Sequence, residues 1–380
     1  MTWEKVKLGD CCTSITDGDH QAPPKSKDGI PFITIANIDQ FNRIDFTNTM
    51  HVPKDYFDSL DSKRKPHVGD IIYSVVGSFG IPVYIKNNDM FTFQRHIAIL
   101  KCKENINSRF LYYVMKSRAF YHQADSVAIG SAQKTITLSA LRDMEVHLPE
   151  RKVQDKIASI LSAYDDLIEN NRRQIKLLEE AAERLYKEWF VKFHYPGSGN
   201  AAGPDNLPVG WNRILVKDIT EIKTGKRDAN FSTNDGKFPF FTCSDEMLKA
   251  DSYSFSGNAV ILAGNGNFRV RIFRGNFEAY QRTYVMQPFE GKYIYLLYWS
   301  IKNSINTLIN GASGSTILFL KKAMIENISV IIPSPMILLT FNNYMSRIQL
   351  ALEDKYEEIA LLQEARDRLL PKLMSGEVEV

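Results

Sequence analysis

The chain has 380 residues, of which 24% are charged, and its formal net charge is +3. This length can hold two domains with cores of their own, and the near-neutral charge excludes a uniformly basic nucleic-acid binder. The four cysteines show neither CxxC spacing nor a paired framework, so we expect a reduced, cytoplasmic protein without structural zinc. The first ten residues lack the apolar core of a signal peptide, and no apolar run reaches the roughly 18 residues of a membrane span.

Residues 1–149 are predicted to form a mixed, mostly β domain. Short apolar or alternating runs, such as IPFITIANI and GDIIYSVVGSFGIPVYI, are separated by Gly, Pro, Asn and Asp, a pattern typical of strands joined by turns. One helix is predicted near 107–121, with Asn107 or Ser108 as its N-cap.

Residues 150–193 are predicted to form one long amphipathic helix. Mostly apolar residues recur every seven positions in two columns, which indicates a coiled coil. The columns are Ile157, Tyr164, Asn171, Leu178, Leu185 and Leu161, Ile168, Ile175, Ala182, Trp189. A helix of about 33 residues would be about 50 Å long, which is more than a small domain can cover, so it requires a partner helix.

The partner helix is predicted 184 residues further on, within residues 333–376. The shifted columns are Phe341, Ile348, Lys355, Leu362, Leu369 and Met345, Leu352, Ile359, Arg366, Leu373. The middle of the first column is polar in both copies, and a buried polar residue there fixes the register of two helices. Between the helices, the Gly- and Pro-rich residues 194–208 predict a linker, and residues 209–332 predict a second domain.

The second domain repeats the plan of the first with different polar residues. GWNRILVKDITEIKTG parallels WEKVKLGDCCTSITDG, FPFFTCSD stands where IPFITIAN stood, and GASGSTI at 311–317 answers GSAQKTI at 130–136. The fold class is therefore predicted as α+β: two tandem α/β domains joined by two long antiparallel coiled-coil helices, with pseudo-two-fold symmetry and neighbouring termini. One scaffold with two different surfaces suggests two binding sites for related but unlike targets.

Several sequence fragments, taken in their order along the chain, resemble the specificity subunit of Type I restriction–modification systems. The resemblance covers essentially the whole chain. The resemblance rests on the W…V.LGD start, GDIIYSVVGSFG, GSAQKTITLSAL, the helix at 150–193, the LPVGW restart and the PKLMSGEV ending. It implies two target recognition domains, each reading one part of a split DNA site. The second half departs from the first, because its loop lacks the Gln133–Lys134 pair and its helix carries Lys355 and Arg366 in the columns.

The resemblance also implies partners and a division of labour. The helices would act as an antiparallel spacer and dock two adenine-methyltransferase (modification) subunits, which a restriction/translocase subunit would join. The chain itself would be no enzyme and hold no cofactor; S-adenosylmethionine, ATP and Mg²⁺ would belong to the partner subunits. The unlike loops predict an asymmetric, bipartite double-stranded DNA target. A spacer of ~45–50 Å compares with ~34–36 Å per turn of DNA, so we expect half-sites about one turn apart.

Candidate DNA contacts in the first domain lie in its polar loops and basic turns. Small residues, hydroxyls, an amide and a Lys in the GSAQKTITL loop suit phosphate and base-edge contact, although a plain surface loop would look the same. The basic residues of the PPKSK and DSKRKP segments suit phosphates or simple solubility. The candidates are Lys25, Lys27, Arg64, Gln94, Arg95, Ser131, Gln133, Lys134 and Thr135.

In the second domain, NGNFRVRIFRGN places Arg and Asn around a predicted strand. Alternation puts Arg269 and Arg271 on one strand face. Arg suits bidentate contact with guanine, and Asn suits bidentate contact with adenine. The alternative is a strand face that is simply exposed to solvent. YQRT at 280–283 occupies the place of FQRH at 93–96 in the repeat, which strengthens both Gln-Arg pairs as candidates. The full set is Lys226, Arg227, Asn265, Asn267, Arg269, Arg271, Gln281, Arg282, Ser313 and Ser315.

Two alternative functions remain open on the sequence. One is a metal-dependent nuclease, because Asp205, Glu221 and Lys223 follow a spacing that could hold Mg²⁺ and activate water. The other is a coiled-coil scaffold without a DNA role. The sequence contains no P-loop and no adenine-methyltransferase tetrapeptide, and its seven His show no metal-ligand spacing, so we expect no catalytic or metal site in the chain.

Overall fold

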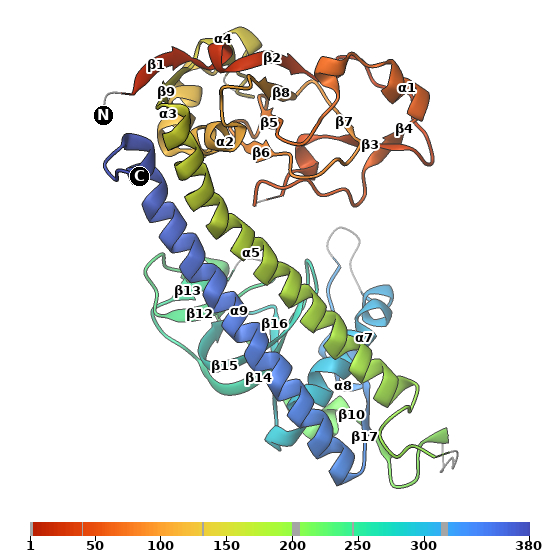
Figure 1. Cartoon of the computed structure of the whole chain (residues 1–380). Helices are drawn as coiled ribbons and strands as arrows, with labels where there is room; N and C mark the ends of the chain where they lie inside the picture. Colours follow the sequence, from red (N-terminus) through yellow and green to blue (C-terminus); the bar gives the residue numbers. More distant parts are fainter. Residues whose placement is uncertain (1–2, 40, 131–132, 200–205, 245–246, 313–317) are drawn as a thin grey trace. The chain divides into compact units, whose positions relative to one another are not determined.

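The computed structural model describes residues 3–39, 41–130, 133–199, 206–244, 247–312 and 318–380 (Figure 1). The chain forms two compact units: Met1–Arg172 with Tyr356–Val380, and Arg173–Lys355. The division falls inside both long helices, so each unit contains one α/β part and a segment of each helix. None of the described helices is both long and apolar enough to cross a membrane.

The first unit combines three small sheets with short helices. Its strands are β1 (Glu4–Lys7), β2 (Cys12–Asp17), β3 (Ile30–Ile33), β4 (Met50–Val52), β5 (Ile71–Ser74), β6 (Pro82–Tyr84), β7 (Thr92–Phe93), β8 (Ile97–Cys102) and β9 (Glu145–Leu148). They pair in the orders β1-β9, β2-β8-β5-β6 and β4-β3-β7. The short helices are α1 (Lys54–Ser59), α2 (Ser108–Lys116), α3 (Arg118–Val127) and α4 (Leu138–Asp143).

The helix predicted near 107–121 is two helices in the structure. Asn107 caps α2 as predicted, because its side chain accepts a hydrogen bond from the Phe110 amide at 3.0 Å. The prediction of a single helix is wrong, because Ser117 adopts an extended backbone and its hydroxyl accepts from the Phe120 amide, which starts α3. A second N-cap inside the apolar pattern therefore divides the helix.

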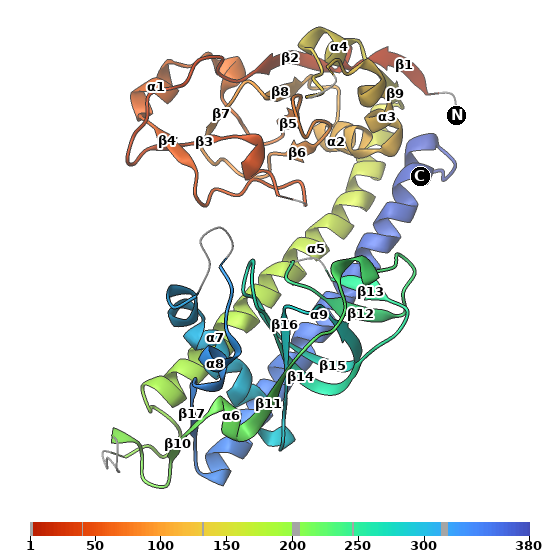
Figure 2. The same cartoon turned by 180° about the vertical axis from the view of Figure 1, so that it is seen from behind.

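The second unit contains one pair of strands and one larger sheet (Figure 2). Its strands are β10 (Asn212–Leu215), β11 (Thr220–Thr224), β12 (Phe238–Phe241), β13 (Leu248–Ala250), β14 (Phe255–Ala263), β15 (Val270–Ala279), β16 (Thr283–Pro288) and β17 (Ser329–Ile332). They pair as β10-β17 and β11-β16-β14-β15-β12-β13. The helices of this part are α6 (Val216–Ile219), α7 (Ile294–Asn310) and α8 (Lys322–Glu326).

The strand pairings confirm the tandem repeat of two α/β domains. In each unit the first strand pairs antiparallel with the strand before a long helix, as β1 with β9 and β10 with β17. A parallel pair also recurs, with Phe32 opposite Thr92 in the first unit and Phe240 opposite Glu278 in the second. In the second unit, the counterparts of β6 and β7 form one ten-residue strand, β15. Because β15 pairs with both β14 and β12, the strands of this unit belong to one larger sheet.

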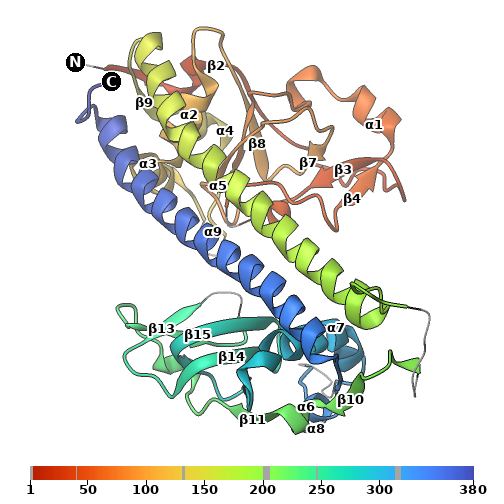
Figure 3. The same ribbon diagram turned by 60° about the horizontal axis from the view of Figure 1, so that its bottom comes forward.

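The two long helices are α5 (Arg151–Tyr186), which continues into a π-helical turn at Lys187–Val191, and α9 (Pro335–Ser375). Within each unit their segments run antiparallel. In the first unit, Ile157 and Leu161 share a core with Leu370 and Leu373. In the second, Tyr186 and Phe190 pack with Phe341. The beginning of α9 lies beside α7 (Figure 3). Every column residue predicted from the seven-residue spacing is buried or half-buried.

The polar column residues find different surroundings. Arg366 donates to the Asp165 carboxylate at 2.6 Å inside the first unit, and that carboxylate also accepts from the Tyr113 hydroxyl at 2.7 Å. The Asn171 side chain is buried, and its amide nitrogen has no hydrogen-bond partner among the described residues. Trp3 and Val380 pack against the same core, so the described ends of the chain lie together as predicted.

Candidate nucleic-acid interface

In the first unit, three turns converge where β2 ends and β8 begins. Asp19 forms a parallel bridge with Gln94, and the Arg95 amide donates to the Asp19 carbonyl at 3.1 Å. The Arg64 guanidinium reaches the Asp17 and Asp19 carboxylates at 3.9 and 3.7 Å. The structure therefore brings Arg64, Gln94 and Arg95 together, with Arg95 exposed and Gln94 half-buried.

The described residues of the 129–136 loop join this group through the segment after β5. Val75 donates to the His96 carbonyl and accepts from the Ile136 amide, while Val76 bridges Thr135. The edge thus runs continuously from the Gln94 turn to the loop that carries the predicted Gln133, Lys134 and Thr135. Ser131 lies outside the described residues.

Lys134 is already engaged by its own unit. Its ammonium pairs with Asp125 and lies 5.8 Å from the centre of the Phe79 ring. The hydrogen bond to Asp125 raises the pKa of Lys134. A phosphate contact by Lys134 would therefore compete with an existing, solvent-exposed ion pair, which is a weak interaction.

Lys25 and Lys27 lie apart from the converging turns. Both are exposed, and Ser26 between them bridges His51 of β4. Because β4 and β7 are opposite edges of the three-stranded sheet, these lysines lie across that sheet from the Gln94 turn. They suit a phosphate strand at the periphery better than a base edge.

The second unit gathers its candidates at the corresponding place. Arg227 bridges Tyr280, and its carbonyl accepts from the Gln281 amide at 2.9 Å. The Arg282 carbonyl accepts from the Gly264 amide at 2.9 Å, which brings the NGN loop to the same turn. The Arg227 guanidinium lies 3.6 Å from the buried Glu278 carboxylate and stacks over Phe231. Lys226, next to Arg227, is exposed.

The predicted strand residues extend this group along β15. Asn265 bridges Phe319, and the Asn267 side chain accepts from the Arg269 amide at 3.0 Å. Arg269 precedes β15, whereas Arg271 lies within the strand with its guanidinium 5.9 Å from the centre of the Phe241 ring. Ser313 and Ser315 lie outside the described residues.

The proposed equivalence of the two Gln-Arg pairs is wrong by one residue. Phe93 stands opposite the last residue of β3, and Ala279 stands opposite the last residue of β12, so these two residues occupy equivalent places. Gln94 therefore corresponds to Tyr280, and Arg95 corresponds to Gln281. The turns that meet these positions also differ in length, because Lys226 separates Gly225 from the bridging Arg227, whereas Gly18 directly precedes the bridging Asp19. The two turns thus present different side chains at matching backbone positions.

A family model described as the Type I restriction modification DNA specificity domain matches residues 1–180 and 208–350. The chain belongs to this family. The EcoDI specificity subunit of Escherichia coli is 36% identical over 177 residues, which cover 45% of this chain and 39% of that protein. The MjaIX specificity subunit of Methanocaldococcus jannaschii is 28% identical over 327 residues, which cover 78% of this chain and 75% of that protein. The chain thus spans less than half of the length of the EcoDI specificity subunit.

The same fold occurs in a solved member of the family. The crystal structure of the Type-I restriction-modification system S subunit from M. genitalium superposes with a TM-score of 0.61, covering 98% of this chain and 96% of that chain at 16% identity. The DNA specificity domain model matches once in each half of the chain, which agrees with the tandem repeat seen in the strand pairings.

The residues suggested for a nuclease do not form a site among the described parts of this specificity-domain chain. Lys223 pairs with Glu221 at 3.3 Å on the exposed face of β11. Asp205 lies outside the described residues. No group of three or more His, Cys, Asp or Glu in the described ranges is arranged to hold a metal ion.

The sequence reasoning missed the acidic residues that organise both turns. Asp17 and Asp19 hold Arg64, and Glu278, which is fully buried, accepts from Ser254 at 2.7 Å and faces Arg227. A signal for Glu278 was present, because a Glu within the apolar GNFEAY strand requires a partner. These carboxylates fix the direction of the arginines that the specificity domains offer to solvent.

Proposed function

We propose that the chain is the DNA-binding specificity subunit of a Type I restriction–modification complex. Each unit would bind one half of a bipartite double-stranded site through its converging turns. The observation that carries this proposal is the recurrence of the same bridge, Asp19–Gln94 and Arg227–Tyr280, with basic and amide side chains at both. Membership of the specificity-domain family supports it.

The proposal predicts an asymmetric target. Matching backbone positions carry Arg95 in the first unit and Gln281 in the second, and these side chains suit different bases, since Arg favours guanine and Gln favours adenine. Arginines 64 and 227, held by carboxylates, would supply phosphate or base contacts beside them. Serines 131, 313 and 315 remain candidates from the sequence alone.

The chain would work without chemistry of its own. Two modification subunits would dock on the long helices and methylate adenine, and a restriction/translocase subunit would join them. S-adenosylmethionine, ATP and Mg²⁺ would be bound by those partners. The helices would set the distance between half-sites, so adding one heptad to both should lengthen the spacer by ~10 Å, or about 3 base pairs.

Mapping methylated adenines in a host that carries this chain and its modification partner tests the proposal. We expect one asymmetric motif with two constant parts and a fixed gap. Arg95→Ala should relax one part and Gln281→Ala the other, so each variant is the control for its counterpart. Methylation without sequence preference, or a loss of both parts by either variant, would overturn the proposal.

A further inference from the structure

The two units differ sharply at one equivalent place, where the α/β part meets the long helices. The helix repeat of 184 residues and the strand registers define the matching positions on the long helices and the sheets, and SRFLYYVMK of α2 aligns with IYLLYWSIK of α7. Tyr84, Arg109, Lys116, Asp165 and Arg366 of the first unit correspond to Ile272, Tyr295, Lys302, Gln349 and Ala182 of the second. The same scaffold therefore carries a charged lining in one copy and a mainly apolar one in the other.

The copies also differ in the space that they enclose. The first unit has a cavity of about 320 Å³ here, whereas the second has about 40 Å³. The smaller space holds about one water molecule, since Trp299, Met345 and Leu352 fill the surroundings. The second copy shows that the scaffold can close at this place. The cavity of the first unit is thus not required by the fold, and its size falls within the range of small-molecule sites.

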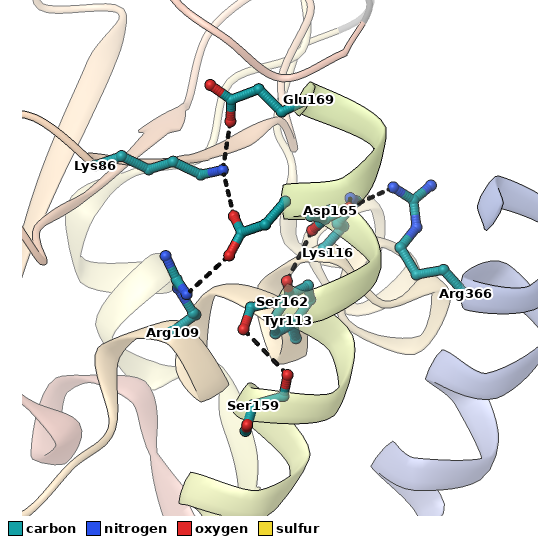
Figure 4. Close-up of polar contacts among 10 residues, drawn as sticks. Lys86, Arg109, Tyr113, Lys116, Ser159, Ser162, Asp165, Glu169 and Arg366 are labelled. Atoms are coloured by element: carbon teal, nitrogen blue, oxygen red, sulfur yellow. Dashed lines mark hydrogen bonds and ion pairs between the residues drawn. The ribbon is translucent and has the colours of Figure 1, made fainter. Parts of the chain in front are cut away.

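The side chains that line the first cavity include both cations and carboxylates. The lining contains four carboxylates, Asp89, Asp165, Asp166 and Glu169, and six cationic groups, which are Arg43, Lys86, Arg109, Lys116, Arg172 and Arg366. Three of the carboxylates are already paired: Asp165 with Arg366, and Asp166 and Glu169 with Lys86 at 3.0 and 2.7 Å (Figure 4). Two carboxylates beside the lining pair with further cations, Asp39 with Arg43 at 2.8 Å and Asp367 with Arg366 at 2.7 Å, so among the described residues Arg172 is the lining cation that no ion pair neutralises.

Arg172 has the clearest free capacity among these cations. Its guanidinium stacks on the Phe41 ring at 3.7 Å from the centroid, and no carboxylate of the described residues forms an ion pair with it. Burial lowers the pKa of Arg172, and neighbouring Arg43 lowers it further. A half-buried guanidinium with an aromatic face and without a carboxylate partner is suited to a bidentate contact with phosphate.

Aromatic side chains complete the cavity. Phe41, Phe46, Phe91, Tyr84 and Tyr112 line it, and Arg109 lies over the Tyr84 ring at 5.1 Å. Flat apolar surfaces of this kind suit a planar ring, while the guanidinium of Arg172 suits a phosphate group, so together they suit a phosphate monoester.

We propose that the cavity of the first unit binds a small phosphate monoester carrying a planar ring, of about the size of a nucleoside monophosphate. The phosphate would lie against Arg172 with Arg43 and Lys86 nearby, and the ring would lie against the aromatic wall. This ligand site is separate from DNA reading and does not depend on the proposed function.

Calorimetric titration of the full-length chain, without DNA, tests the site. The probes are adenosine, guanosine, cytidine and uridine monophosphates, with adenosine and inorganic phosphate as comparisons. We expect at least one monophosphate to bind at least tenfold more tightly than adenosine or phosphate. Arg172→Gln should weaken that binding at least tenfold, whereas Lys302→Gln, which changes the cation at the equivalent place of the second unit, should leave it unchanged.

Thermal unfolding of both variants verifies that they fold, and Arg43→Gln provides a second cavity variant if Arg172→Gln does not fold. Absence of binding by all four monophosphates would overturn the proposal. Equal affinity for adenosine or for phosphate alone would also overturn it, as would affinities that are unchanged in the cavity variant or lost equally in Lys302→Gln.

Discussion

Replacing Arg366 by Ala should destabilise the first unit strongly, because it leaves a buried carboxylate without its main partner. The Arg366 and Asp165 side chains are 13% and 18% exposed and lie 2.6 Å apart. Breaking a buried pair from one side costs ~3–5 kcal/mol. Asp165 would keep the Tyr113 hydroxyl at 2.7 Å and Lys116 at 3.9 Å, so we expect the lower end, about 3 kcal/mol.

Thermal unfolding of the full chain measures this loss as a shift of the transition that belongs to the first unit. A unit of about 200 residues loses ~2–4 °C of Tm per kcal/mol, so Arg366→Ala should lower the transition by roughly 6–12 °C. The double variant Asp165→Gln with Arg366→Ala reproduces the residues of the second unit, Gln349 and Ala182. It should recover at least half of the loss, because no buried carboxylate remains.

The same pair gives the stability a defined pH dependence. Burial raises the pKa of Asp165, but Lys116, Arg366 and Tyr113 together hold it below its ordinary value. The stabilisation is therefore present above about pH 4 and is lost as pH falls through the lower folded pKa. The advantage of the wild type over Arg366→Ala should shrink in that acid range. A Tm of Arg366→Ala within 1 °C of the wild-type Tm would contradict this prediction. A Tm of the double variant below that of Arg366→Ala would also contradict it.

Three other outcomes follow from the interface geometry. Lys25→Ala with Lys27→Ala should reduce the salt slope of DNA binding by about 2 and weaken all sequences alike, measured by titration at several salt concentrations. Arg271→Ala should cost ~1–3 kcal/mol of discrimination at one base position, and a uniform loss across sequences would contradict this. Gly18→Ala should destabilise by ~2–4 kcal/mol in chemical denaturation, because its Cβ would lie 2.0 Å from the Phe93 carbonyl oxygen, whereas Gly291→Ala meets nothing within 4 Å and should be near neutral.

The long helices and the repeat could be predicted from the sequence, because seven-residue spacing and self-similarity are local or periodic signals. Leu161 and Ile168 are buried as their column requires. The break at Ser117 was missed, since its hydroxyl competes with the helix only once the Phe120 amide is placed.

The candidate turns were predicted as segments but not as a site. Their convergence depends on strand register, and the register also decides that Arg95 corresponds to Gln281. The cavity could not be predicted either, because Asp165 and Arg366 meet across 201 positions of sequence. A cation in an apolar column is visible in the sequence, but its partner is visible only in the packed structure.

The pairing of β1 with β9, and of β10 with β17, brings the entrance and the exit of each α/β part side by side. Glu4 stands opposite Leu148, and Asn212 stands opposite Ile332, immediately before the long helices begin. Everything between these strands forms a cassette whose two ends are held together by its own backbone. A foreign cassette with the same end strands could replace it without altering the helices, so new target sequences could arise by exchange of whole segments rather than by gradual change of single contacts.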